Sequence, residues 1–204
     1  MKISFDTNSD SYDDALSAVR ASYGIPLGVS DEPNTSGIGS PGPGGGTVFF
    51  DAGAQQNWGR YLEVAPDGWS GEGADLNMME IDPDELKDVE AWPAFNETRA
   101  EIGTGLTNTR HIIQQVKSSA AHVCVTYRGG ACDDWFLPSV DELTALYVVN
   151  SRVGIFEIGD YYYSSSLNDE TGWGIFPWLV NFGNGYRNTV DEGLERLVRP
   201  IRAF

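Results

Sequence analysis

The chain is poor in basic residues and in long hydrophobic runs, and each scarcity excludes a class of protein. It has 13 lysines and arginines against 30 acidic residues, a formal net charge of −17. A chain this acidic repels phosphate backbones, so we expect no direct binding to nucleic acid. No hydrophobic run approaches the roughly 18–20 residues that a membrane-spanning helix needs, so we also expect no membrane span.

Cysteine is equally scarce. Cys124 and Cys132 are the two cysteines, and they flank a turn-like sequence that can bring them together. They lack the two-residue spacing of a redox pair or a zinc knuckle. With two cysteines and no secretory signal, we favour reduced thiols over a disulfide between Cys124 and Cys132, and we expect no metal and no other cofactor.

The N-terminus has no continuous apolar stretch of the kind that a secretory signal needs. It reads Met1-Lys2-Ile3-Ser4-Phe5-Asp6 and becomes acidic at once. We therefore expect a cytoplasmic or virion-associated protein.

Acidic residues are concentrated between Glu63 and Glu101, where twelve acids are opposed by Lys87 and Arg99. Their spacing lacks the Asp-x-Asp-x-Asp-Gly pattern of a calcium-binding EF-hand loop. We expect this stretch to form a solvated acidic surface.

Three parts follow one another along the chain. In residues 1–24, Ile3 and Phe5 alternate with polar residues, and apolar residues then recur at helical spacing, which predicts a strand followed by an amphipathic helix. This element is too short to bury a core alone, so we expect it to pack on the main domain or on a partner. Residues 25–41 are rich in glycine, proline and serine and predict a linker, and residues 42–204 predict the domain proper.

The glycines at 42 and 44–46 are not followed by the Lys-Ser/Thr pair of a phosphate-binding loop. We expect them to allow tight backbone turns into the first strand of the domain.

Two helices are expected in the domain. Thr107, Asn108 or Thr109 can cap the first, which would carry Ile112, Ile113, Val116 and Ala120 on one face, with His111 and His122 in the same helix. The second follows Ser139-Val140-Asp141-Glu142, a capping box in which Ser139 and Glu142 bond each other's backbone amides.

Short strands should surround these helices, at 47–50 (ended by a turn at 51–53), 61–64, 161–163, 178–182 and 196–199. Helices followed by several short strands predict an α+β domain. We expect Trp135, Phe136, Phe182 and Phe204 in its core, and Arg199 and Arg202 paired with acids.

Several motifs in this order resemble Lcl-type domains, a bacterial and phage family with the C-type lectin fold. The motifs are Gly42–Gly53, Gly59–Pro66, Ile102–Gly105, Asp134–Ser139 with Asp141-Glu142-Leu143, Tyr162–Ser166, Asn181–Gly185 and Val198–Phe204. The chain departs from the family at Tyr162-Tyr163, where Tyr-Trp is common, and across Asn168–Phe176. The resemblance implies a C-type-lectin-like domain with two helices and short antiparallel strands.

The resemblance also implies a function. Family members include surface adhesins and the variable proteins of diversity-generating retroelements, some of which form the receptor-binding tips of phage tails. Their variable side chains lie before the terminal Arg-Pro motif. The corresponding ligand-binding candidates are Trp173, Trp178, Asn181, Asn184, Tyr186, Arg187, Asn188, Thr189, Asp191, Glu192 and Glu195.

We therefore expect a non-enzymatic protein whose C-terminal surface recognises a macromolecular ligand. The alternative is a structural or virion-assembly subunit that forms oligomers through residues 1–24.

Overall fold

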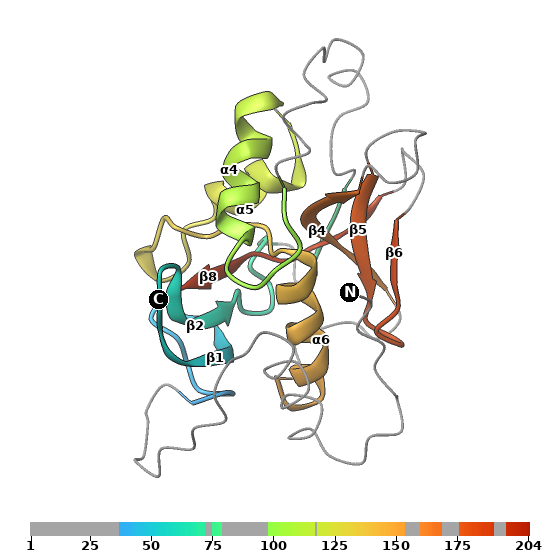
Figure 1. Cartoon of the computed structure of the whole chain (residues 1–204). Helices are drawn as coiled ribbons and strands as arrows, with labels where there is room; N and C mark the ends of the chain where they lie inside the picture. Colours follow the sequence, from blue (N-terminus) through green and yellow to red (C-terminus); the bar gives the residue numbers. More distant parts are fainter. Residues whose placement is uncertain are drawn as a thin grey trace.

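The computed structural model describes residues 37–71, 75–78, 98–116, 118–153, 160–168, 176–189 and 195–204 (Figure 1). The strand–helix element expected at residues 1–24 and most of the linker expected at 25–41 lie outside these ranges. At the end of that linker, Ile38 packs against the main hydrophobic core. The folded part of the chain therefore begins before residue 42.

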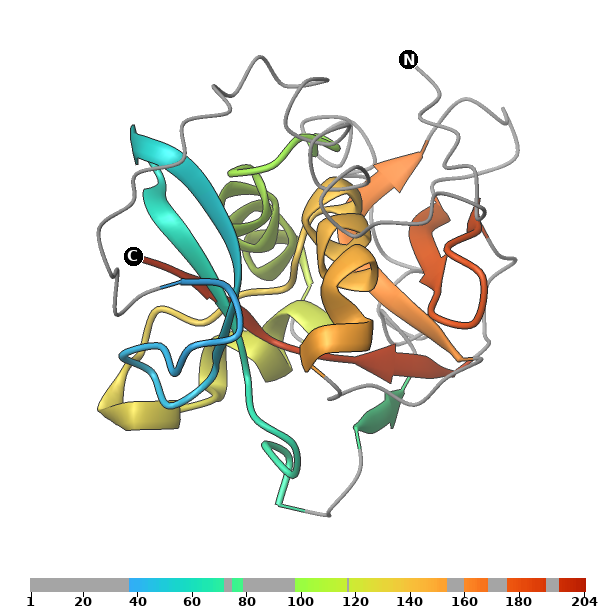
Figure 2. The same cartoon turned by 90° about the horizontal axis from the view of Figure 1, so that it is seen from below.

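The chain is an α+β protein in which helix α6 (Val140–Val153) lies between two sheets (Figures 1 and 2). The three-stranded sheet has the order β1-β2-β8, with β1 Thr47–Gln56, β2 Gly59–Val64 and β8 Ile201–Ala203. The five-stranded sheet has the order β3-β7-β4-β5-β6, with β3 Leu76–Met78, β7 Arg196–Val198, β4 Tyr161–Asn168, β5 Phe176–Asn181 and β6 Arg187–Thr189.

The described residues form three α-helices, although the sequence led us to expect two. Besides α6 there are α4 (Gly105–Gln115) and α5 (Ala120–Thr126), where we expected one helix. The short 3-10 turn η1 (Gly129–Ala131) follows them. The prediction of one helix through Ala120 was wrong because Val116 is extended and Ser119 starts a new helix, accepting a hydrogen bond from the His122 N–H at 3.3 Å. His111 and His122 consequently lie on different helices.

Helix α4 also begins earlier than expected, after Thr104. Asn108 and Thr109 lie inside the helix and are buried. The Asn108 amide donates to the Arg99 carbonyl at 2.6 Å, and the Thr109 hydroxyl donates to the Leu137 carbonyl at 3.1 Å. These polar side chains connect α4 to neighbouring segments and do not cap it.

The capping box at the start of α6 is confirmed. The Ser139 N–H donates to Glu142 Oε2 at 2.7 Å, and the Glu142 N–H donates to Ser139 Oγ at 3.3 Å. Glu142 is completely buried, and its other oxygen accepts from the Gly103 N–H at 2.8 Å. One carboxylate thus joins the start of α6 to the loop that precedes α4.

The strands differ from expectation in several respects: β3 and β6 were not predicted, and β4 continues to Asn168. Strand β1 continues to Gln56, so the turn expected at 51–53 was wrong. Strand β4 pairs with β7 in parallel, so the larger sheet is mixed, whereas we expected antiparallel strands. The C-terminal segment supplies a strand to each sheet, with β7 and β8 separated by Arg199 and Pro200 (Figure 2).

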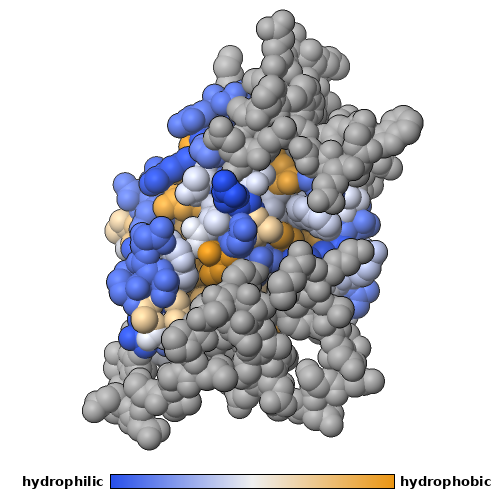
Figure 3. Space-filling model, viewed as in Figure 1, coloured by the Kyte–Doolittle hydropathy of each residue, from blue (hydrophilic) through white to orange (hydrophobic). Residues whose placement is uncertain are grey.

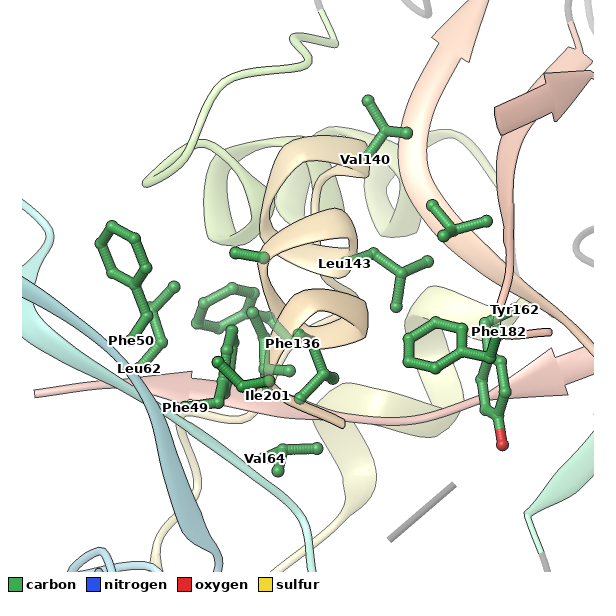
Figure 4. Close-up of a cluster of buried hydrophobic side chains, with 14 of the residues drawn as sticks. Phe49, Phe50, Leu62, Val64, Phe136, Val140, Leu143, Tyr162, Phe182 and Ile201 are labelled. Atoms are coloured by element: carbon green, nitrogen blue, oxygen red, sulfur yellow. The ribbon is translucent and has the colours of Figure 1, made fainter. Parts of the chain in front are cut away.

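The main core surrounds α6 (Figure 4). Phe49 and Leu62 reach it from the smaller sheet, and Tyr162 reaches it from the larger one. Trp135, Phe136 and Phe182 are buried as expected. Phe204 is half-buried against the Tyr61 ring, with the ring centroids 5.4 Å apart, so it is less deeply placed than we expected.

The glycines before β1 permit a close approach to β2. The N–H groups of Gly44 and Gly46 donate to the Glu63 carboxylate at 2.9 and 3.2 Å. A Cβ atom on Gly44 would lie 2.5 Å from the Trp135 ring, so a larger residue would collide there. Glu63 and Asp75 are both buried, so the solvated acidic surface predicted for this region was wrong for these two residues.

The two arginines near the C-terminus are paired with acids, as expected. The Arg199 Nε lies 2.6 Å from Asp75 Oδ1, and both side chains are buried. Arg202 pairs with Glu63 at 2.9 Å and also with Asp134. These ion pairs hold the terminal segment against both β2 and the loop that precedes β3.

Candidate binding surface

The C-terminal candidates that the structure describes centre on the β5–β6 hairpin at one edge of the five-stranded sheet (Figure 1). The strands are antiparallel, and the register places Trp178 opposite Thr189, Leu179 opposite Asn188 and Val180 opposite Arg187. Leu179 and Val180 are buried in the core, so this hairpin is anchored through β5.

Asn181 builds the turn between the two strands. Only 8% of the residue is exposed. Its Oδ1 accepts from the N–H groups of Gly183 and Asn184 at 2.8 and 3.2 Å, and its own N–H donates to the Tyr186 carbonyl at 2.9 Å. The resemblance implies a ligand contact here, but the geometry gives the side chain a role within the turn.

Gly185 seats the turn directly on helix α6. Its φ of +70° belongs to the left-handed region that favours glycine. A Cβ atom at this position would lie 2.4 Å from the Tyr147 ring. The Tyr147 ring in turn packs edge-on against Phe182, with centroids 5.7 Å apart. The hairpin turn therefore rests on a fixed aromatic support.

Tyr186 stands out from this supported turn. It is 61% exposed, and among the described residues no other large hydrophobic side chain is exposed. Its N–H donates to Asn184 Oδ1 at 2.9 Å, which fixes the backbone beneath the side chain. Elsewhere, on the face seen in Figure 3, hydrophobic residues form separate spots among hydrophilic ones.

Arg187 is the first residue of β6, and it points towards α6. Its Nη2 lies 2.6 Å from Asp141 Oδ1, and the two side chains are 23% and 9% exposed. Burial raises the pKa of Asp141 above its ordinary value, while the charge of Arg187 and its hydrogen bond oppose that shift. Arg187 is therefore occupied by an internal ion pair.

The other described candidates border the hairpin. Asn188, Thr189 and Trp178 are half-buried, and Asn184 is exposed. Trp178 also packs against the main core. We call Asn184, Tyr186 and Asn188 the hairpin surface; Thr189 lies opposite Trp178 on the other face of β6.

Glu195 lies at the same end of the sheet as the hairpin turn. Strand β7 runs parallel to β4 with Leu197 opposite Tyr162, and β5 runs antiparallel to β4 with Asn181 opposite Tyr161. Glu195 is exposed, and its carboxylate accepts from the Asn77 amide at 3.3 Å. Of the remaining candidates, Trp173, Asp191 and Glu192 lie outside the described residues.

The sequence did not reveal how the serines of β4 support this region. Ser165 and Ser166 are buried, and β4 is irregular between Tyr163 and Leu167. The Val140 N–H donates to Ser166 Oγ at 3.0 Å, and the Ser165 N–H donates to the Pro138 carbonyl at 2.7 Å. A signal for this role was present in the sequence, since three serines directly follow three tyrosines in the same strand. Serine hydroxyls that are buried in a strand need hydrogen-bond partners, which indicates bonds to neighbouring segments.

Two of the groups that could support chemistry, the Cys124 thiol and the Glu142 carboxylate, are buried, whereas Cys132 is partly exposed. Cys124 and Cys132 are free thiols, and burial raises the pKa of the Cys124 thiol well above its ordinary value. Burial likewise raises the pKa of Glu142 to about 7, although the backbone N–H groups of Ser139 and Gly103 lower it. Across the ranges that the structure describes, no three His, Cys, Asp or Glu residues form a group that could hold a metal ion.

None of the helices in the described ranges combines the length and the apolar character needed to cross a membrane. In the comparisons with known proteins, no protein-family model and no curated protein matches this chain.

Proposed function

We propose that the chain is a non-enzymatic binding protein with a C-type-lectin-like domain, and that the hairpin surface contacts a macromolecular ligand. The observation that carries the proposal is Tyr186, a 61% exposed tyrosine on a turn that is fixed from below. Tyrosine gives a binding surface a large contact area at a low cost in conformational entropy, and asparagine adds adaptable hydrogen bonds. The hairpin surface combines both residue types.

The support beneath the hairpin favours this proposal. Asn181 bonds the turn, and Gly185 rests against Tyr147 of α6. A contact residue held on a rigid element loses less entropy on binding than one on a loose loop. Trp178, half-buried on β5, adds an aromatic residue to the same hairpin, whereas Glu195 precedes β7, which β4 separates from β5.

The test is a comparison of two matched double variants. Tyr186→Ala/Asn188→Ala removes side chains from the hairpin surface. Arg110→Ala/Gln114→Ala likewise removes two side chains with polar groups, from α4, where both residues are exposed. Fluorescent tetramers of each protein are incubated with a panel of bacterial cells, purified surface polysaccharides and purified surface proteins.

We expect wild type and the α4 variant to bind at least one member of the panel, and the hairpin variant to lose that binding. The three proteins should keep the same melting temperature within about 4 °C, because three of the four substituted residues are exposed and Asn188 is half-buried, so each variant should lose roughly 1 kcal/mol or less. Equal binding by both variants, or no binding by wild type, would contradict the proposal.

The related proposal that this surface is diversified by a retroelement has a separate test in the neighbouring DNA. We expect a reverse-transcriptase gene and a near-copy of the 3′ coding region beside the gene. Their absence would favour a fixed adhesin or a tail subunit.

A further inference from the structure

The position of strand β6 depends on more than its backbone pairing. It contains three residues, Arg187–Thr189, and within the described chain it pairs with β5 at the edge of the sheet. Short edge strands carry few backbone hydrogen bonds and are among the first segments to open locally. A side-chain contact that ties β6 to the interior therefore has a large influence on its geometry.

The ion pair between Arg187 and Asp141 is such a contact. Its atoms are 2.6 Å apart, and the two side chains are 23% and 9% exposed. Partly desolvated ion pairs are stronger than surface pairs because water screens them less. The pair connects the first residue of β6 to the first turn of α6.

Asp141 is itself held in place. Its N–H donates to the Ala100 carbonyl at 3.0 Å, and the preceding Val140 N–H donates to Ser166 Oγ at 3.0 Å. The next residue, Glu142, closes the capping box with Ser139. A negative charge is also favoured at a helix N-terminus. The acid that receives Arg187 is thus part of a rigid frame.

This anchor has a consequence for the neighbours of Arg187. Side chains alternate across a strand, so a guanidinium fixed on α6 places Asn188 on the opposite face of β6. Tyr186 precedes Arg187 directly, and its carbonyl is bonded to the Asn181 N–H at 2.9 Å. Fixing Arg187 therefore fixes the backbone that carries the two central residues of the hairpin surface.

We propose that Arg187 is a positioning residue of the hairpin surface, whose ion pair with Asp141 holds Tyr186 and Asn188 in their binding orientation, and that it is not itself a ligand contact. This inference rests on the proposed function. It moves Arg187, which the resemblance placed among the contact residues, into the supporting frame.

Hydrogen–deuterium exchange of the full chain without ligand tests whether the ion pair fixes β6. The variants are Arg187→Met, Asp141→Asn, the corresponding double variant and Arg187→Lys. We expect each single neutral variant to speed exchange in the peptide covering residues 182–189 on the order of tenfold, and the double variant to add little more, because coupled partners are not additive. Exchange in α6 beyond its first turn should stay unchanged.

Arg187→Lys separates the positive charge from general packing. It should keep β6 exchange within about threefold of wild type, because the ammonium can still reach the carboxylate. Unchanged exchange in Arg187→Met, or fully additive effects in the double variant, would overturn the anchoring role.

Binding to the panel described above then separates positioning from direct contact. Arg187→Lys should bind as wild type does, and Arg187→Met should bind several-fold more weakly. Loss of binding in Arg187→Lys with normal β6 exchange would show that Arg187 contacts the ligand, which refutes the inference. If wild type binds nothing, the proposed function fails and the inference fails with it as a statement about binding, while the exchange data still decide whether the ion pair anchors β6.

Discussion

Replacing Glu142 with glutamine tests whether a fully buried carboxylate titrates near neutral pH in the folded protein. Its two oxygens accept from the N–H groups of Ser139 and Gly103 at 2.7 and 2.8 Å. Burial raises its pKa from 4.5 to about 7, against the opposing effect of these hydrogen bonds. Glutamine has nearly the same shape and no titratable proton, so it isolates the effect of ionisation.

Whether Glu142 stabilises or destabilises the fold as the pH rises depends on which state, folded or unfolded, binds its proton more tightly. The folded protein keeps Glu142 protonated at pH values where the unfolded chain has already lost that proton. The contribution of Glu142 to the free energy of unfolding is therefore fully present below pH 4.5 and is lost as the pH rises through about 7. A pKa difference of this size corresponds to about 3 kcal/mol.

Glutamine also has a cost of its own. Its NH₂ group must face one of the backbone N–H groups that the carboxylate now receives, which leaves a buried donor without a partner. Such a donor costs about 1–3 kcal/mol, with little dependence on pH. The quantity to measure is therefore the stability of wild type minus that of Glu142→Gln at each pH, since other titrating groups cancel in this difference.

Urea unfolding followed by tryptophan fluorescence, at several pH values between 4.5 and 8, supplies that difference. We expect it to fall by about 3 kcal/mol over this range, with the midpoint of the fall between the two pKa values. A difference that stays constant within about 0.5 kcal/mol, or that rises with pH, would refute the reasoning, because it would mean that Glu142 titrates at or below its ordinary pKa.

Two further predictions concern a close packing contact at Gly185 and the buried ion pair between Asp75 and Arg199. Gly185→Ala should lower stability by about 1–3 kcal/mol more than Gly71→Ala, because both positions have positive φ values but only a Cβ atom at 185 meets the Tyr147 ring, at 2.4 Å; equal melting temperatures for the two variants would contradict this. Asp75→Asn should cost about 3–5 kcal/mol in urea unfolding, because it removes the buried acid that pairs with Arg199 and leaves the exposed Asp67 as its nearby counter-charge. Its control is Asp67→Asn, whose carboxylate is 72% exposed and 3.6 Å from Arg199; an equally large loss in that control would show that burial of the pair is not the cause.

Several structural features follow from local signals. The capping box at Ser139 and Glu142 was predictable, because its two partners are three residues apart and bond each other. Apolar and aromatic runs likewise predicted β2, β5 and β7 close to their observed positions, and the start of β4. Such features depend on neighbours in the chain, which any fold that uses them must bring together.

Other features could not be predicted because their causes are distant in sequence. Asn108 and Thr109 were interpreted as caps, but they bond the backbone of Arg99 and Leu137 inside the fold. Ser119, the residue that starts α5, was missed because a favourable apolar pattern continues across it. Glu63 was grouped with surface acids, although it is buried, where it accepts a hydrogen bond from the Gly44 N–H and pairs with Arg202. Polar residue types are ambiguous until their partners are known.

In the hairpin region, too, some features follow from neighbouring residues and others from contacts that are distant in sequence. The sequence by itself determined a polar, glycine-containing turn after the apolar strand β5, since a turn's residues specify its backbone. Only the tertiary structure decided that Asn181 closes that turn and that Arg187 bonds Asp141, whereas the exposure of Tyr186 was expected of a ligand contact. The physical reason is that a side chain's role depends on the charge and space across from it, and the packing of α6 against β5 and β6 sets both.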